Sequence, residues 1–118
     1  MALSELKNVI SEFDYESGMA YCGEDEEFFL EMLSDYVDSG RDELLPKLYE
    51  AKDWVNYEIE VHALKSTSRM MGFPLLGDKC EVLQNAAAAK DEATLNAKHG
   101  EMMSSYEKIL MAVRNEIG

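Results

Sequence analysis

The segment from Asp53 to Ala87 reads DWVNYEIEVHALKSTSRMMGFPLLGDKCEVLQNAA, and it decides the fold class. An aspartate precedes a long run in which apolar residues recur three and four positions apart, a pattern typical of an amphipathic helix. Gly72 ends this run, and Pro74 follows where proline is common, in the first turn of a new helix. The segment therefore predicts two helices joined by a short turn, with Asp53 as the N-cap of the first.

The residues before this segment have the same helical character. We expect one short helix within residues 3–10 and a second after an N-cap at Asp14. A longer helical pattern runs from about residue 25 to residue 51, and Phe28 belongs to its apolar stripe. A kink or brief break is expected within that pattern, where the sequence places Gly40 and Pro46.

A final helix is expected after an N-cap at Asp91. Its inward positions recur at helical spacing and are Leu95, Met102, Met103, Tyr106, Ile109, Leu110 and Val113. In the helix that starts at Pro74, Leu75 and Leu76 are both expected to face inward. Strand patterns are nearly absent, so four substantial helices with short connections predict an all-α chain. The expected architecture is an antiparallel four-helix bundle with a short additional N-terminal helix, forming one domain over residues 1–118.

Composition and charge argue against several classes of function. The net charge is −13, from 11 basic and 24 acidic residues, which disfavours binding to nucleic acid or to an anionic membrane surface. No apolar run approaches the roughly 20 residues that cross a bilayer, and the start of the chain lacks a signal-peptide pattern. We therefore expect a cytoplasmic protein. Cys22 and Cys80 stand alone and indicate neither a disulfide framework nor a zinc site.

His62 is the residue of the quoted segment that could carry chemistry. A helix turns by about 100° per residue, which places His62 on the polar face of its helix together with Lys65, Ser66 and Arg69. A histidine in this position is often only a solvated side chain. Imidazole, however, is largely neutral at neutral pH, with an ordinary pKa of about 6.5, and can carry a phosphoryl group on nitrogen.

The surroundings of His62 suit that chemistry. The two basic residues would offset the charge of phosphoryl oxygens, and the neighbouring serines are small. Gly72 would leave a gap at the end of the helix, while Val55 and Ile59 would give the site an apolar border. His62 and Glu58 lie one turn apart, but two ligands do not make a metal site, so no metal is expected. The second histidine, His99, is expected to be an exposed helix residue.

The stretch HALKSTSRMMG resembles the signature of histidine-containing phosphotransfer (HPt) domains. In that signature a lysine follows the histidine by three residues, small residues come next, and a glycine stands near ten residues after the histidine. The segments DYESGMAYCGEDEEFFLEMLSDY, DWVNYEIEVHALKS and GFPLLGDKCEVLQNAA are also similar to the family. Together the resemblance covers roughly residues 13–91.

The resemblance implies a phosphorelay carrier, a phosphoprotein of two-component signal transduction with phosphohistidine at His62. It also implies that Lys65 helps to hold the phosphoryl group. Ser66 stands where the family often has glycine, and Gln84 stands where some members place a polar side chain beside the imidazole. No glycine-rich phosphate loop or kinase signature is present, so we expect a carrier and not an enzyme with its own kinase site.

The same resemblance implies the partners. They would be a response-regulator receiver domain and a hybrid sensor kinase, with the Mg²⁺ held by the receiver and no cofactor in this chain. Docking would centre on His62, with Val55, Ile59 and Met70 as apolar contacts and with Ser66 and Arg69 as a polar rim. The carrier would be a monomer. Met19, in the short helix after Asp14, would cover part of this surface.

Two other functions remain open. One is a helical-bundle interaction module that holds partners without phosphoryl chemistry. The other is the excised histidine domain of a larger hybrid or chemotaxis-type sensor kinase.

Overall fold

The computed structural model describes residues 3–117, and this part of the chain is built from helices without strands. The elements are η1 (Leu3–Asn8, a 3-10 helix), α1 (Tyr15–Tyr21), α2 (Glu26–Val37), α3 (Arg41–Glu50), α4 (Trp54–Met70), α5 (Pro74–Ala88) and α6 (Glu92–Ile117). The predicted all-α class is confirmed. Within residues 3–117, no helix combines the length and the apolar character that crossing a membrane requires.

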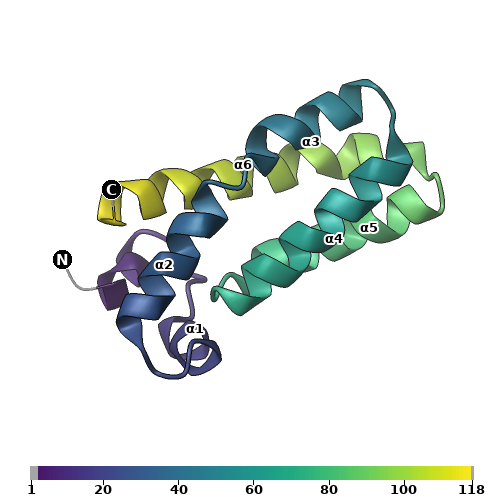
Figure 1. The fold of residues 1–118 in the computed structure, drawn as a ribbon. Coiled ribbons are helices and arrows are strands. Elements are labelled where there is room, and N and C mark those ends of the chain that lie inside the picture. Colours follow the sequence, from purple (N-terminus) through teal and green to yellow (C-terminus); the bar gives the residue numbers. More distant parts are fainter. Residues whose placement is uncertain (1–2, 118) are drawn as a thin grey trace.

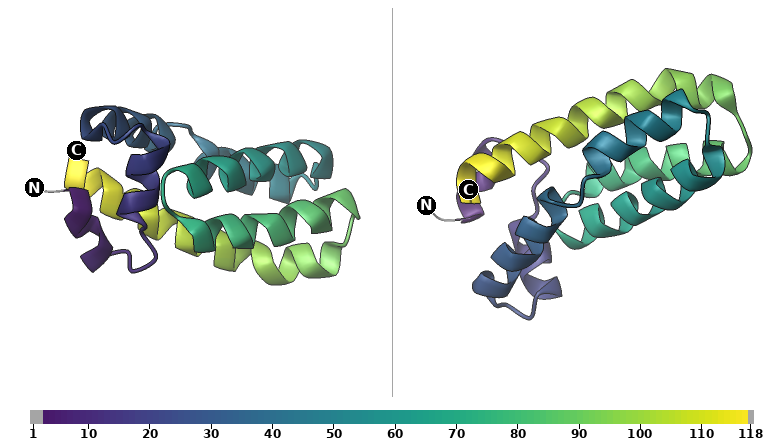
Figure 2. Two further views of the ribbon diagram at one scale, coloured as in Figure 1. Left: turned by 90° about the horizontal axis from the view of Figure 1, so that it is seen from below. Right: turned by 45° about the horizontal axis from the view of Figure 1, so that its top comes forward.

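Helices α3, α4, α5 and the first part of α6 lie side by side as an antiparallel bundle (Figure 1). Helix α6 is the longest and continues past the bundle, where its last turns lie against η1 and α2 (Figure 2). Together η1, α1 and α2 cover the end of the bundle at which both termini lie. The opposite end holds the α3–α4 and α5–α6 connections.

Aspartate side chains start four of the helices, because each carboxylate accepts a hydrogen bond from the backbone N–H three residues later. Asp14, Asp25, Asp53 and Asp91 all do so, at 3.0, 3.2, 3.3 and 3.2 Å. Of these four, the sequence analysis named all but Asp25 as caps, and those three predictions are confirmed.

The long helical pattern over residues 25–51 is interrupted once. Helix α2 ends at Val37 and α3 begins at Arg41, after Gly40 in the left-handed region with φ of +79°. The predicted break at Gly40 is therefore confirmed. At Pro46 there is no break, because α3 continues through this residue to Glu50 although proline lacks the backbone donor of a helical hydrogen bond. A kink there stays a prediction.

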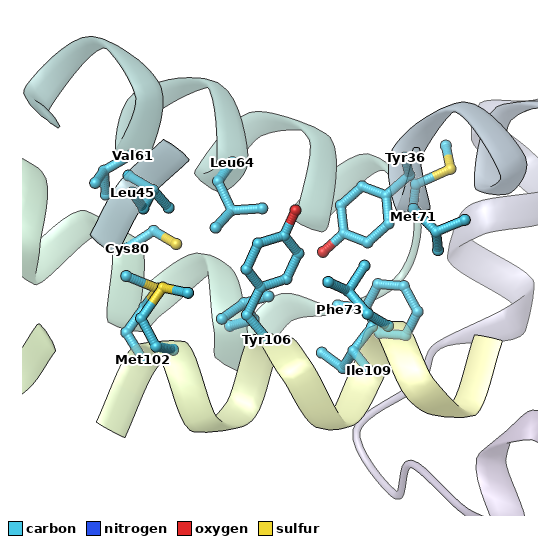
Figure 3. Close-up of a cluster of buried hydrophobic side chains, with 14 of the residues drawn as sticks. Tyr36, Leu45, Val61, Leu64, Met71, Phe73, Cys80, Met102, Tyr106 and Ile109 are labelled. Atoms are coloured by element: carbon cyan, nitrogen blue, oxygen red, sulfur yellow. The ribbon is translucent and has the colours of Figure 1, made fainter. Parts of the chain in front are cut away.

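The core runs along the inner faces of the helices, and Figure 3 shows its central part. All the inward positions predicted for the last helix are buried. Two other predictions are wrong, because Phe28 and Leu75 keep 43% and 56% of their surface exposed. In each case the next residue, Phe29 or Leu76, takes the inward position, since neighbours on a helix differ by about 100° in direction.

Ser68, a buried polar residue of the core, has a hydrogen-bond partner. The hydroxyl oxygens of Tyr36 and Ser68 lie 2.8 Å apart, which joins α2 to the last turn of α4. Because an unpaired buried hydroxyl is costly, this hydrogen bond fixes how α2 meets the bundle.

Candidate functional site

His62 lies on the outer face of α4. The buried residues of this helix are Trp54, Tyr57, Val61, Leu64 and Ser68, which recur three and four positions apart. His62 follows Val61 directly, so its side chain points away from the core and is exposed. Val55 and Ile59, two turns and one turn earlier, keep 68% and 56% of their surface exposed. The predicted stripe of an exposed imidazole with an apolar border is thus present.

The two basic residues near His62 both reach toward α5. The Lys65 ammonium lies 4.0 Å from Glu81 Oε1, and only 16% of the Lys65 side chain is exposed. The Arg69 guanidinium donates a hydrogen bond to Asp78 Oδ1 at 3.0 Å and lies 3.6 Å from Glu81 Oε2. The hydrogen bond with Asp78, helped by the charges of both carboxylates, raises the pKa of Arg69 above its ordinary value. Both cations are therefore offset by carboxylates of α5.

These α5 carboxylates were not predicted from the sequence. Asp78 and Glu81 are three residues apart and so share one helical face, and the short α4–α5 turn predicts that the two helices are neighbours. That signal could have found them. Gly77 makes the contact possible, because a Cβ atom there would lie 2.6 Å from Cγ of Arg69.

Ser66 and Gln84 are both half-buried beside this face. The Oε1 atom of Gln84 is buried without a hydrogen-bond partner among the described residues. None of the hydrogen bonds that the structure shows for residues 3–117 joins Gln84 to His62. The role of Gln84 beside the imidazole stays a prediction.

Gly72 does not leave a gap, and that prediction is wrong. The residue is buried with φ of +92°, and a Cβ atom there would lie 2.5 Å from the carbonyl oxygen of Asp14. The backbone N–H of Asp14 also donates to the Gly72 carbonyl at 2.8 Å. Only glycine readily adopts this left-handed turn and allows so close an approach. The contacts of Gly72 with Asp14 tie the start of α1 to the α4–α5 turn.

The two methionines expected near the site, Met70 on α4 and Met19 on α1, are half-buried and pack against the core.

His99 is buried, and the prediction of an exposed helix residue is wrong. It keeps 9% of its surface exposed, its Nδ1 lies 2.8 Å from the Tyr57 hydroxyl, and its ring stacks on Tyr49 with centroids 3.9 Å apart. Burial lowers the pKa of His99, against a smaller opposite effect from Glu50. The sequence held the signal, because His99 follows Leu95 by four residues in the inward stripe of its helix.

The described residues offer little for metal or thiol chemistry. No group of three or more histidine, cysteine or acidic side chains within residues 3–117 is arranged to hold a metal ion. Cys22 and Cys80 are free and buried, and burial raises the pKa of the Cys80 thiol to about 12. A protonated, buried thiol is a poor nucleophile. His62 is therefore the accessible nucleophile of this face.

Comparison with protein families gives a match over most of the chain. A family model described as Hpt domain matches residues 27–117, a range that runs from the first turn of α2 to the end of α6 and includes His62. No curated protein and no solved structure matches the chain significantly.

Proposed function

The chain belongs to the Hpt domain family, and on that basis we propose that it carries a phosphoryl group on His62 as a module of a two-component phosphorelay. The family acts in histidine phosphotransfer, and His62 is the exposed one of the two histidines of this chain. That exposure, within the family-matched residues and one turn from a lysine, is the observation that carries the proposal. His99 is buried against two tyrosine rings and cannot be approached by a donor in this fold.

The transfer would use the neutral imidazole as the nucleophile. A ring nitrogen attacks the phosphorus of an aspartyl phosphate, and the N–P bond forms as the P–O bond to the aspartate breaks. The aspartate leaves as a carboxylate with the bonding electron pair, while the other ring nitrogen keeps its proton. Such transfer depends on in-line placement and charge stabilisation, so Lys65 would assist by its charge. The reverse reaction would pass the group to a second receiver.

The proposed partners are a response-regulator receiver domain and a hybrid sensor kinase. The receiver would bring the Mg²⁺, and this chain would need no cofactor of its own. The exposed stripe of Val55, Ile59 and His62, bordered by Ser66 and Arg69, supports docking on α4. In this proposal the carrier acts in the cytoplasm, as a monomer and without a kinase site of its own.

Phosphorylation of the purified protein by phosphoramidate tests the proposal. Intact mass and phosphorus NMR should show one added phosphate that is labile to acid and stable to base. His62→Gln should take up none, and the matched variant His99→Gln should still take up one. Circular dichroism of each variant establishes that it is folded.

Two results would contradict the proposal. The first is acid-labile phosphate on folded His62→Gln. The second is a folded wild-type protein that accepts no phosphate from phosphoramidate or from phosphorylated receiver domains, which would favour the interaction-module alternative.

A further inference from the structure

Glu81 stands between the two basic residues of the site. One of its carboxylate oxygens lies 4.0 Å from Lys65 Nζ, and the other lies 3.6 Å from Arg69. The residue is on α5, whereas both cations are on α4, so this carboxylate links the two helices at the level of the site. Half of the Glu81 side chain is exposed, so the carboxylate is still reached by solvent.

The two cations are held in different ways. Arg69 crosses over Gly77 and donates a hydrogen bond to Asp78 at 3.0 Å, so its guanidinium has a fixed place. Lys65 has no comparable hydrogen bond among the described residues, and its distance of 4.0 Å to Glu81 is that of a loose ion pair. Arg69 is therefore the fixed partner of Glu81, and Lys65 is the exchangeable one.

Burial of its stem limits where the Lys65 ammonium can go. Only 16% of the Lys65 side chain is exposed, so most of that side chain packs against neighbouring residues. Residues three apart on a helix are neighbours, so His62 lies beside Lys65 on α4, while Glu81 meets Lys65 from α5. A phosphoryl group carries close to two negative charges, whereas Glu81 carries one that it already shares with Arg69.

We propose that Glu81 is a positioning residue that holds Lys65 against α5 and competes with a phosphoryl group on His62 for the lysine ammonium. This inference rests on the proposed function, because it requires that His62 be phosphorylated. Glu81 then slows phosphorylation of His62 and weakens the hold of Lys65 on the product. Removing its charge releases Lys65 toward His62.

The test compares wild type, Glu81→Gln, Lys65→Gln and the double variant. The rate of phosphorylation by phosphoramidate, followed by intact mass, should rise about two- to fivefold in Glu81→Gln, the range that an exposed ion pair supports. Lys65→Gln alone should be slower than wild type. In the double variant the Glu81 substitution should have almost no effect, because the lysine on which it acts is gone.

Glu58→Gln is the matched control. Glu58 lies one turn before His62 on α4, so this change removes a carboxylate from the same face without touching the contact with α5. The effect of Glu58→Gln on the rate should be equal with and without Lys65.

A second measurement follows the phosphorus NMR signal of phosphohistidine as pH changes. The pH midpoint of this signal should fall in Glu81→Gln, because a closer lysine ammonium favours the phosphoryl dianion. When Lys65 is absent, Glu81→Gln should shift the midpoint clearly less.

The outcomes separate this inference from the proposed function. If wild type takes up no phosphate, the proposed function fails and this inference fails with it. If wild type is phosphorylated but Glu81→Gln reacts at the wild-type rate, only the inference about Glu81 is overturned. An equal gain with and without Lys65 overturns it too, because the effect of Glu81 would then be general charge and not the position of the lysine.

Discussion

The two histidines occupy opposite surroundings in one bundle. His62 lies on the outer face of α4 between an apolar border and two paired cations, whereas His99 lies inside a cluster with Tyr49, Trp54 and Tyr57. This aromatic cluster lies next to the α3–α4 connection, because Tyr49 and Trp54 stand on either side of that connection and contact each other. The same side chain is thus available for chemistry in one place and is part of the core in the other.

The comparison shows that accessibility and stability are assigned to different histidines. An exposed imidazole is reached by a large partner but makes few contacts, so its loss should cost the fold little. A buried imidazole that stacks and hydrogen-bonds contributes to folding but cannot be reached. Each of the following predictions tests this division through stability, beginning with the largest effect.

Truncation should separate the two histidines most strongly. We expect His99→Ala to lower the free energy of unfolding by about 3 kcal/mol, because it opens a cavity and leaves the buried Tyr57 hydroxyl without its partner. His62→Ala should change the same quantity by less than about 0.5 kcal/mol, as is usual for an exposed site. Urea unfolding followed by circular dichroism measures both. Equal losses in the two variants would break the comparison.

The structural class and the position of His62 could be predicted from the sequence because they depend on local signals. Capping aspartates and helical periodicity are encoded within a few residues, and the angle of His62 relative to Val61 and Leu64 follows from helix geometry alone. The polar face of α4 was therefore predicted before any contact between helices was known.

What the sequence analysis missed depends on contacts across helices. The pairing of Arg69 and Lys65 with α5 requires the register of two helices, and the burial of His99 requires that Tyr49 and Tyr57 meet it from α3 and α4. The role of Gly72 depends on the approach of Asp14, which lies 58 positions earlier in the sequence. Spacing along one helix does not report such distances.

A smaller effect is expected from the hydrogen bond alone. Tyr57→Phe keeps the ring of the aromatic cluster but removes the hydroxyl that lies 2.8 Å from His99 Nδ1. The free energy of unfolding should fall by about 1–2 kcal/mol, since one buried ring nitrogen loses its partner. The same urea experiment measures it, with Tyr21→Phe as a control at an exposed tyrosine. A loss no larger than that of the control would mean that packing alone holds His99 in place.

The smallest effect is a dependence of stability on pH that comes from the buried His99. Burial lowers the pKa of His99 below its ordinary value of 6.5, so the unfolded chain takes up the proton at a higher pH than the folded chain does. Stability therefore rises with pH between the lowered pKa and 6.5. The contribution of His99 is fully present above that window and is lost as pH falls through it.

This sign is tested when unfolding is measured at a series of pH values from about 5 to 8, above the range in which most carboxylates titrate. His99→Gln should flatten the rise in this window, because it removes the group whose pKa burial lowers. The comparison uses the slope and not the absolute stability, so the lower stability of His99→Gln does not obscure the result. A slope that persists unchanged in His99→Gln would assign the linked proton to another group, and burial of His99 would then not be the source of the pH dependence.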